Sequence, residues 1–183
     1  MAYKGKVLTN PVTGQDIRFL KTSKDTGGQL LEMESTYAPR SVEPIAHYHP
    51  AQEEDFTVIE GVLSVKMNGV LRLYKANDRF KVPKGTVHSM WNASAGRTVI
   101  NWQVRPALNT EYLLETTTGL VNDGKTGANG KPGLLQIALI APRYASVFRL
   151  AKPPYAVQRI LFALLTPFAR LAGYKAVYPK YID

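Results

Sequence analysis

The sequence of 183 residues contains no cysteine, which excludes disulfide bonds and thiolate metal ligands. A chain without cysteine also fits a reducing compartment. No uncharged apolar run reaches the roughly 20 residues that are needed to span a bilayer. The first residues, MAYKGKVLTNP, contain no apolar segment typical of a secretory signal. We therefore expect a cytoplasmic protein.

The sequence contains only three histidines, and all three fall in one spaced pattern. His47 and His49 stand two residues apart, so both imidazoles project from the same face if this segment is a β-strand. His88 follows a Pro-Lys-Gly turn and would join them from a neighbouring strand. A single histidine is more often a half-buried structural residue, but three in one pattern favour a metal site.

A carboxylate completes this pattern. The residues after the turn at 51–53 predict a returning strand, on which Glu54, Phe56 and Val58 share one face. If Phe56 and Val58 line the interior, Glu54 points inward with them, whereas Glu53 points to water and is the weaker candidate. The predicted metal ligands are therefore His47, His49, Glu54 and His88.

Three imidazoles and one carboxylate suit one divalent transition metal, namely Fe, Mn, Ni, Cu or Zn, and spacing alone does not choose among them. Four protein ligands leave two positions open on a six-coordinate metal, where a substrate or dioxygen could bind. A purely structural zinc site is typically closed and rich in cysteine, which this chain lacks.

The two histidine segments resemble the two motifs of the cupin superfamily. The first motif contains His-x-His, a glutamate and a closing glycine, and here it reads His47, His49, Glu54 and Gly61. The second contains Pro-x-Gly, a histidine and an asparagine, and here it reads Pro83, Gly85, His88 and Asn92. The leading glycine of each motif is replaced, by Ser41 and by Asn77, and asparagine tolerates the left-handed conformation that glycine usually supplies.

This resemblance implies a mainly β protein with a jelly-roll barrel and a metal near the centre of one end. All four family ligand positions are filled, which argues against a metal-free member. The surrounding pattern agrees, because short β-branched or aromatic runs alternate with turn signals and Asn68-Gly69 is a strong hairpin signal. The predicted strands include residues 17–20, 29–37, 55–59, 61–67, 70–75, 80–82 and 98–104. We assign residues 1–106 to the barrel domain.

Residues 107–183 predict a helical C-terminal extension, which packs on the barrel or lies at an oligomer interface such as a homodimer contact. One helix would run from Asn109 or Thr110 to about residue 121, and another over 134–150 with a kink at Pro142. A third would start at Pro153-Pro154 and end at Gly173, with a break or bend near 164–166 caused by Pro167. It carries an apolar stripe: Val157, Ile160, Leu161, Leu164, Leu165, Phe168, Leu171 and Ala172.

Residues 134–183 hold seven Lys or Arg residues and one Asp, which is most of the formal net charge of +9. A basic, apolar-striped segment could lie on an anionic membrane surface, but tertiary packing is the commoner fate of such a stripe. The sequence has no dense basic cluster with interleaved aromatic residues, so we expect no nucleic-acid partner.

The pattern favours an oxygenase-type metal enzyme that acts on a small organic substrate. By strand parity the substrate would be lined by Phe56, Val58, Met90 and Asn92, a largely apolar wall. No second titratable group is placed as a general base, so a metal-dependent isomerase or decarboxylase has less support. A non-catalytic ligand-binding or sensor protein is the alternative from another class, because fold and ligand set permit many roles.

Overall fold

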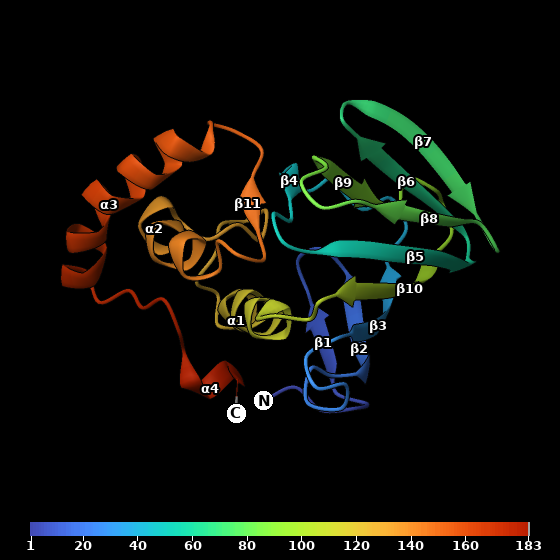
Figure 1. The fold of residues 1–183 in the computed structure, drawn as a ribbon, viewed down its shortest axis with the longest axis horizontal. Helices are drawn as coiled ribbons and strands as arrows, with labels where there is room; N and C mark the ends of the chain where they lie inside the picture. The colour runs from blue at the N-terminus through green and yellow to red at the C-terminus, as the bar shows by residue number, and fades with distance from the viewer. Residues whose placement is uncertain (183) are drawn as a thin grey trace.

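The computed structural model describes residues 1–182 and consists of two antiparallel β-sheets followed by helices (Figure 1). One sheet has the strand order β1-β2-β3-β10-β5-β8, and the other has the order β11-β4-β9-β6-β7. The strands are β1 (Val7–Asn10), β2 (Gln15–Lys21), β3 (Leu31–Tyr37), β4 (His47–Tyr48), β5 (Glu53–Glu60), β6 (Val62–Met67), β7 (Val70–Lys75), β8 (Arg79–Val82), β9 (His88–Trp91), β10 (Thr98–Arg105) and β11 (Arg149–Leu150). The prediction of a mainly β jelly roll is confirmed.

The core follows from the alternation of apolar side chains along the strands. On β5, Glu54, Phe56 and Val58 are all buried, whereas Glu53, Asp55 and Thr57 are only partly buried. Phe56 and Val58 pack with side chains of the opposite sheet, including Leu63 and Val65. Glu54 therefore points into the barrel, as the parity of the strand predicts.

Two turns bear out the reasoning about left-handed residues. Asn68 and Gly69, with φ of 47° and 84°, form the two-residue connection between β6 and β7. Asn77, which stands where the resemblance expects a glycine, has φ of 74°. Asparagine adopts this conformation at lower cost than other non-glycine residues.

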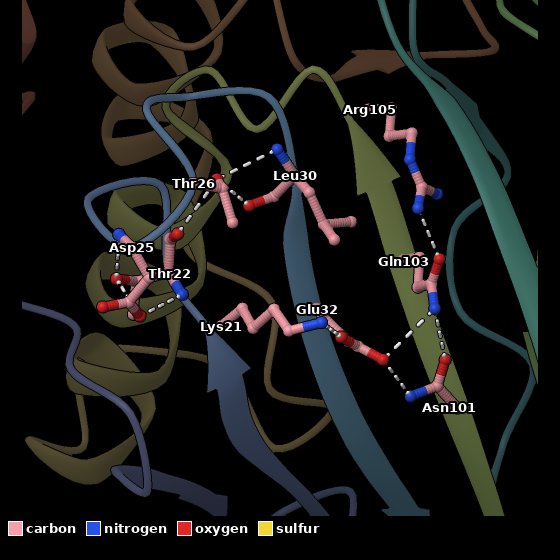
Figure 2. A network of polar contacts seen from close by, with 9 residues as sticks. All are labelled: Lys21, Thr22, Asp25, Thr26, Leu30, Glu32, Asn101, Gln103 and Arg105. Atoms are coloured by element: carbon pink, nitrogen blue, oxygen red, sulfur yellow. Dashed lines mark hydrogen bonds and ion pairs between the residues drawn. The ribbon is translucent and has the colours of Figure 1, made fainter.

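A polar network ties together the middle strands of the six-stranded sheet (Figure 2). Glu32 on β3 accepts hydrogen bonds from Asn101 and Gln103 on β10 at 3.0 and 3.2 Å, and Lys21 on β2 lies 2.9 Å from its carboxylate. Arg105 donates to the Gln103 side-chain carbonyl at 2.8 Å. Charged and amide groups thus satisfy one another across three strands.

The helices gather at one end of the barrel, with α1 beside the strands and α3 outermost (Figure 1). Their bounds are α1 (Thr110–Asn122), α2 (Leu134–Arg143), α3 (Tyr155–Leu171) and α4 (Pro179–Ile182). None of the helices within residues 1–182 is long and apolar enough to cross a membrane.

Buried polar side chains fix α1 against the barrel. Gln52, between β4 and β5, donates to the carbonyls of Pro106 and Ala107 and to the Thr110 hydroxyl at the start of α1. Glu111 accepts hydrogen bonds from the backbone and hydroxyl of Ser23. The connection from β10 to α1 is therefore held by groups that would be costly to leave unpaired.

One detail of the predicted helices is wrong. The second helix ends at Arg143, and residues 149–150 form β11, because β4 needs a hydrogen-bonding partner along its edge and Arg149–Leu150 pair with it. The third helix runs unbroken from Tyr155 to Leu171, so of the two outcomes predicted at Pro167, a break or a bend, the break does not occur. The Thr166 hydroxyl donates to the Phe162 carbonyl at 2.7 Å, so this turn gains a side-chain hydrogen bond beside the proline.

We predict that Gly61→Ala destabilises the fold by at least about 2 kcal/mol. Gly61 has φ of 81°, and an added Cβ would lie 2.3 Å from the Arg97 carbonyl oxygen. Gly69→Ala is the matched control, because Gly69 has φ of 84° but open space around it. The control should lose only about 1 kcal/mol of unfolding free energy, which is the cost of placing alanine in the left-handed conformation. Urea unfolding measures both, and equal losses would contradict the steric account.

Candidate metal centre

The barrel brings the three histidines to one point. His47 pairs with His88 across β4 and β9, and His49 follows directly after β4. One ring nitrogen from each histidine lies within 4.8 Å of the others. His49 and His88 are buried and His47 is half-buried. The group could therefore hold a metal ion that is largely shielded from solvent.

Backbone carbonyls decide which nitrogen of each imidazole faces this point. Nδ1 of His47 lies 3.1 Å from the Ile45 carbonyl oxygen, Nδ1 of His88 lies 3.0 Å from that of Thr86, and Nδ1 of His49 bonds that of Val147. A carbonyl oxygen only accepts, so each Nδ1 must carry the proton. In the neutral rings the Nε2 lone pairs are then free for a metal.

Glu54 lies beside the histidines and is oriented by a tryptophan. The Trp102 indole N–H donates to Glu54 Oε1 at 2.9 Å. The other carboxylate oxygen, Oε2, lies 3.1 Å from His88 Nε2 and 3.3 Å from His49 Nε2. Within residues 1–182, neither Glu54 Oε2 nor His49 Nε2 has a hydrogen-bond partner, although both atoms are buried. Two unsatisfied buried acceptors facing one another are suited to a cation.

The electrostatics of the cluster favour the same assignment. Burial, together with the neighbouring His88 and His49 imidazoles, lowers the pKa of His47 to about 3. Burial would raise the pKa of Glu54, but the His49 and His88 imidazoles outweigh it and hold this pKa below its usual range. The site thus keeps an ionised carboxylate and a neutral His47, the protonation states that metal binding requires. Burial would lower the pKa of His49, but the neighbouring Glu54 carboxylate outweighs it and raises this pKa, so a metal would displace a proton from that ring.

A cavity of about 360 Å³ opens beside the four side chains. Its wall contains Phe56 and Met90, two of the four residues expected to line a substrate, together with both tryptophans. Helices α1 and α2 close the other side through apolar side chains: Leu113, Leu114, Ile137 and Ile140. The lining is predominantly apolar, which suits a small organic molecule.

The other two expected lining residues have different surroundings. Val58 packs in the core with Leu63 and Ile100. Asn92 is fully buried in a turn, where its amide donates to the carbonyls of Ala38 and Gly96 at 3.1 and 2.7 Å. Ser41 accepts a hydrogen bond from the Asn92 backbone N–H at 2.9 Å, so this pair joins the two histidine segments. Strand parity does not apply to Asn92, because it lies just beyond the end of β9.

Comparison with known proteins assigns the chain to a family. The cupin-domain family model matches residues 33–103, which include all four converging side chains. A probable oxidoreductase, virH of Hypocrea virens, is 30% identical over 151 residues, which cover 75% of this chain and 67% of that protein. The chain belongs to the cupin superfamily.

Solved cupin structures share the fold of this chain. A predicted oxalate decarboxylase from Thermotoga maritima superposes with a TM-score of 0.50 and 16% identity, covering 58% of this chain and 99% of the other. An RmlC-like cupin from Shewanella frigidimarina gives a TM-score of 0.50 and 18% identity, covering 61% and 92%. At these identities the likeness concerns the fold alone.

The C-terminal extension of this cupin also reaches the histidines, which the sequence did not predict. Val147 supplies the carbonyl that bonds His49 Nδ1, and the Phe148 ring stacks on His47 with centroids 4.6 Å apart. The segment is secured by β11, which pairs with β4, and by the Ala151 N–H, which donates to the Ala46 carbonyl at 3.0 Å. The only sequence signal was the pair of aromatic or β-branched residues before Arg149.

Trp102 was likewise missed, although its signal was available. It lies on β10 directly opposite Phe56, so its side chain points into the barrel. A tryptophan that points into a core usually finds an acceptor for its N–H, and Glu54 is the carboxylate on the neighbouring strand.

We predict that Trp102→Phe lowers the affinity of this cupin for Zn(II) or Mn(II) by about tenfold or more while the barrel stays folded. The variant keeps the aromatic packing but removes the N–H that orients Glu54 Oε1. Trp91→Phe is the control, since Trp91 also lines the cavity and has no hydrogen bond to Glu54. Titration calorimetry measures both. An unchanged affinity in Trp102→Phe would rule out the orienting role.

Proposed function

We propose that the protein is a mononuclear metal enzyme of oxygenase type that acts on a small, largely apolar organic substrate. The observation that carries this proposal is the convergence of His47, His49, His88 and Glu54 beside an apolar cavity of about 360 Å³. These four side chains would hold the metal, through three Nε2 atoms and Glu54 Oε2. A divalent transition metal in such a site supplies Lewis-acid and redox chemistry at its open positions.

The remaining residues have roles in holding the site and the substrate. Carbonyls of Ile45, Thr86 and Val147 keep the imidazoles in one orientation, so little reorganisation is needed when a metal binds. Phe148, stacked on His47, and the apolar faces of α1 and α2 exclude water from the cavity. The aromatic wall, which includes Phe56 and Trp91, offers flat surfaces to an aromatic or aliphatic substrate.

Tyr37 adds a polar group to this wall. Burial raises the pKa of its hydroxyl, so the group stays protonated at ordinary pH and can donate a hydrogen bond to a bound molecule. A neutral donor in this largely apolar pocket would help to orient a substrate that carries an oxygen function. The name of the Hypocrea virens relative, a probable oxidoreductase, supports redox chemistry over the isomerase or decarboxylase alternative.

The proposal is tested by oxygen consumption. Protein loaded anaerobically with Fe(II), or with Mn(II), is mixed with oxygenated buffer and a panel of small aromatic and aliphatic alcohols, phenols and ketones. We expect oxygen uptake with at least one compound, and a loss of about tenfold or more in both metal content and uptake for His88→Ala. Stabilisation by a compound without uptake would indicate a binding or sensor protein instead. Undiminished metal content in His88→Ala would contradict the ligand assignment.

The role of the cavity is tested separately from the metal. Ala141, on α2, lines the cavity, so Ala141→Phe should fill part of it and reduce uptake by about tenfold or more while metal content is unchanged. Ala163→Phe is the control, because Ala163 is exposed on α3. Retention of full uptake by Ala141→Phe would mean that the substrate binds elsewhere.

A further inference from the structure

Helix α3 presents an apolar face that no other part of the described chain covers. Its buried side chains, Gln158, Phe162 and Ala169, face the rest of the protein, and the helix packs on α2. Apart from the partly buried Leu165, the residues of the predicted stripe lie on the adjoining face and are exposed, with Leu164 66% and Leu171 86% accessible. We call this surface the α3 face; it consists of Val157, Ile160, Leu161, Leu164, Phe168 and Leu171.

The α3 face lies at the periphery of the molecule, on the side of α2 away from the barrel (Figure 1). The cavity is lined by α2 residues such as Ile137 and Ile140, and within the described chain no α3 residue contributes to its wall. The α3 face is therefore a separate surface from the metal centre, and the inference drawn from it does not depend on the proposed activity.

The segment that carries this face is strongly basic. From residue 124 to residue 182 the sequence contains nine Lys or Arg residues and no Asp or Glu, although the adjoining Asp123 pairs with Lys125 and Lys180. Arg159 and Arg170 are exposed and stand about three turns apart on α3, and at about 100° per residue they project from the side of the helix away from the centre of the α3 face. Lys152 and Lys175 are exposed beyond the two ends of the helix. A partner that covers the α3 face should therefore be anionic.

A second copy of the chain fits this requirement poorly. A symmetric contact between two α3 faces would bring two strongly basic segments together, with no Asp or Glu within residues 124–182 to neutralise them. An anionic lipid surface meets both requirements at once, since the acyl region accepts the apolar side chains and the headgroups attract the cations.

We infer that α3 is a docking helix for an anionic membrane surface. The helix has 17 residues and a length of about 25 Å, and none of the described helices is long and apolar enough to cross a membrane. It would lie in the plane of the headgroups, with the α3 face towards the acyl chains and α2 behind it. The protein is thereby held at the surface while the barrel remains in water.

The test is flotation of the full chain with vesicles of phosphatidylcholine mixed with phosphatidylglycerol, compared with vesicles of phosphatidylcholine alone. We expect binding to the anionic vesicles that weakens as the salt concentration rises to about 0.5 M. The double variant Leu164→Gln/Phe168→Gln should bind about tenfold or more weakly, and Lys152→Gln/Lys175→Gln should show a weaker salt dependence. All four side chains are exposed, so these variants should fold.

The matched control is Val70→Gln/Leu73→Gln on β7, where two apolar side chains are exposed to a similar degree, 58% and 61%, on the barrel. This control should bind vesicles as the parent chain does. Absence of binding to anionic vesicles, or equal binding by the Leu164→Gln/Phe168→Gln variant, would overturn the inference. A dimer in light scattering that this variant dissociates, with no vesicle binding, would overturn it too and identify a second copy as the occupant.

Discussion

The geometry of the candidate metal centre depends on one constraint: all three imidazoles donate their Nδ1–H groups to backbone carbonyls. The acceptors are Ile45, Thr86 and Val147, and they leave Nε2 of each ring directed to a common point. Glu54 joins this point because the Trp102 indole holds its other oxygen. Three imidazoles and a carboxylate without such fixed partners would be free to bond one another in several ways, so the carbonyls select a single arrangement.

This constraint links the barrel to its helical extension. Two of the carbonyls belong to the barrel, but Val147 lies between α2 and β11, outside it. The β11–β4 pairing and the Gln158 amide, which donates to the Leu150 carbonyl at 2.9 Å, hold that segment in place. The extension therefore completes the candidate metal centre as well as the wall of the cavity, and α3 contributes to it through Gln158. A barrel without residues 107–183 would lack one of the three orienting acceptors.

The sequence predicted the parts of this site that depend on local periodicity. Strand parity directed Glu54 inward and placed His47 and His49 on one face, whereas the position of the site near one end of the barrel was implied by the resemblance to cupins. The sequence alone could not predict the contacts made by Val147, Phe148 or Trp102, because these contacts depend on which segments meet after folding. Residues 144–150 follow a helical pattern, and their extended end is decided by the unpaired edge of β4, a tertiary effect that overrides propensity. Periodicity predicted the apolar stripe on α3. It could not predict that the stripe is exposed, because the same periodicity occurs in a covered and in an uncovered helix face.

The direct test of whether the three histidines and Glu54 hold a metal ion is anomalous diffraction at metal absorption edges. The crystals should contain the full chain, purified without chelators. We predict one peak per chain, about 2.0–2.3 Å from Nε2 of His47, His49 and His88 and from Glu54 Oε2, with each Nδ1 still bonded to its carbonyl. A peak coordinated by an Nδ1 atom, or crystals grown with added Mn(II) or Zn(II) that show no peak among these four side chains, would contradict it.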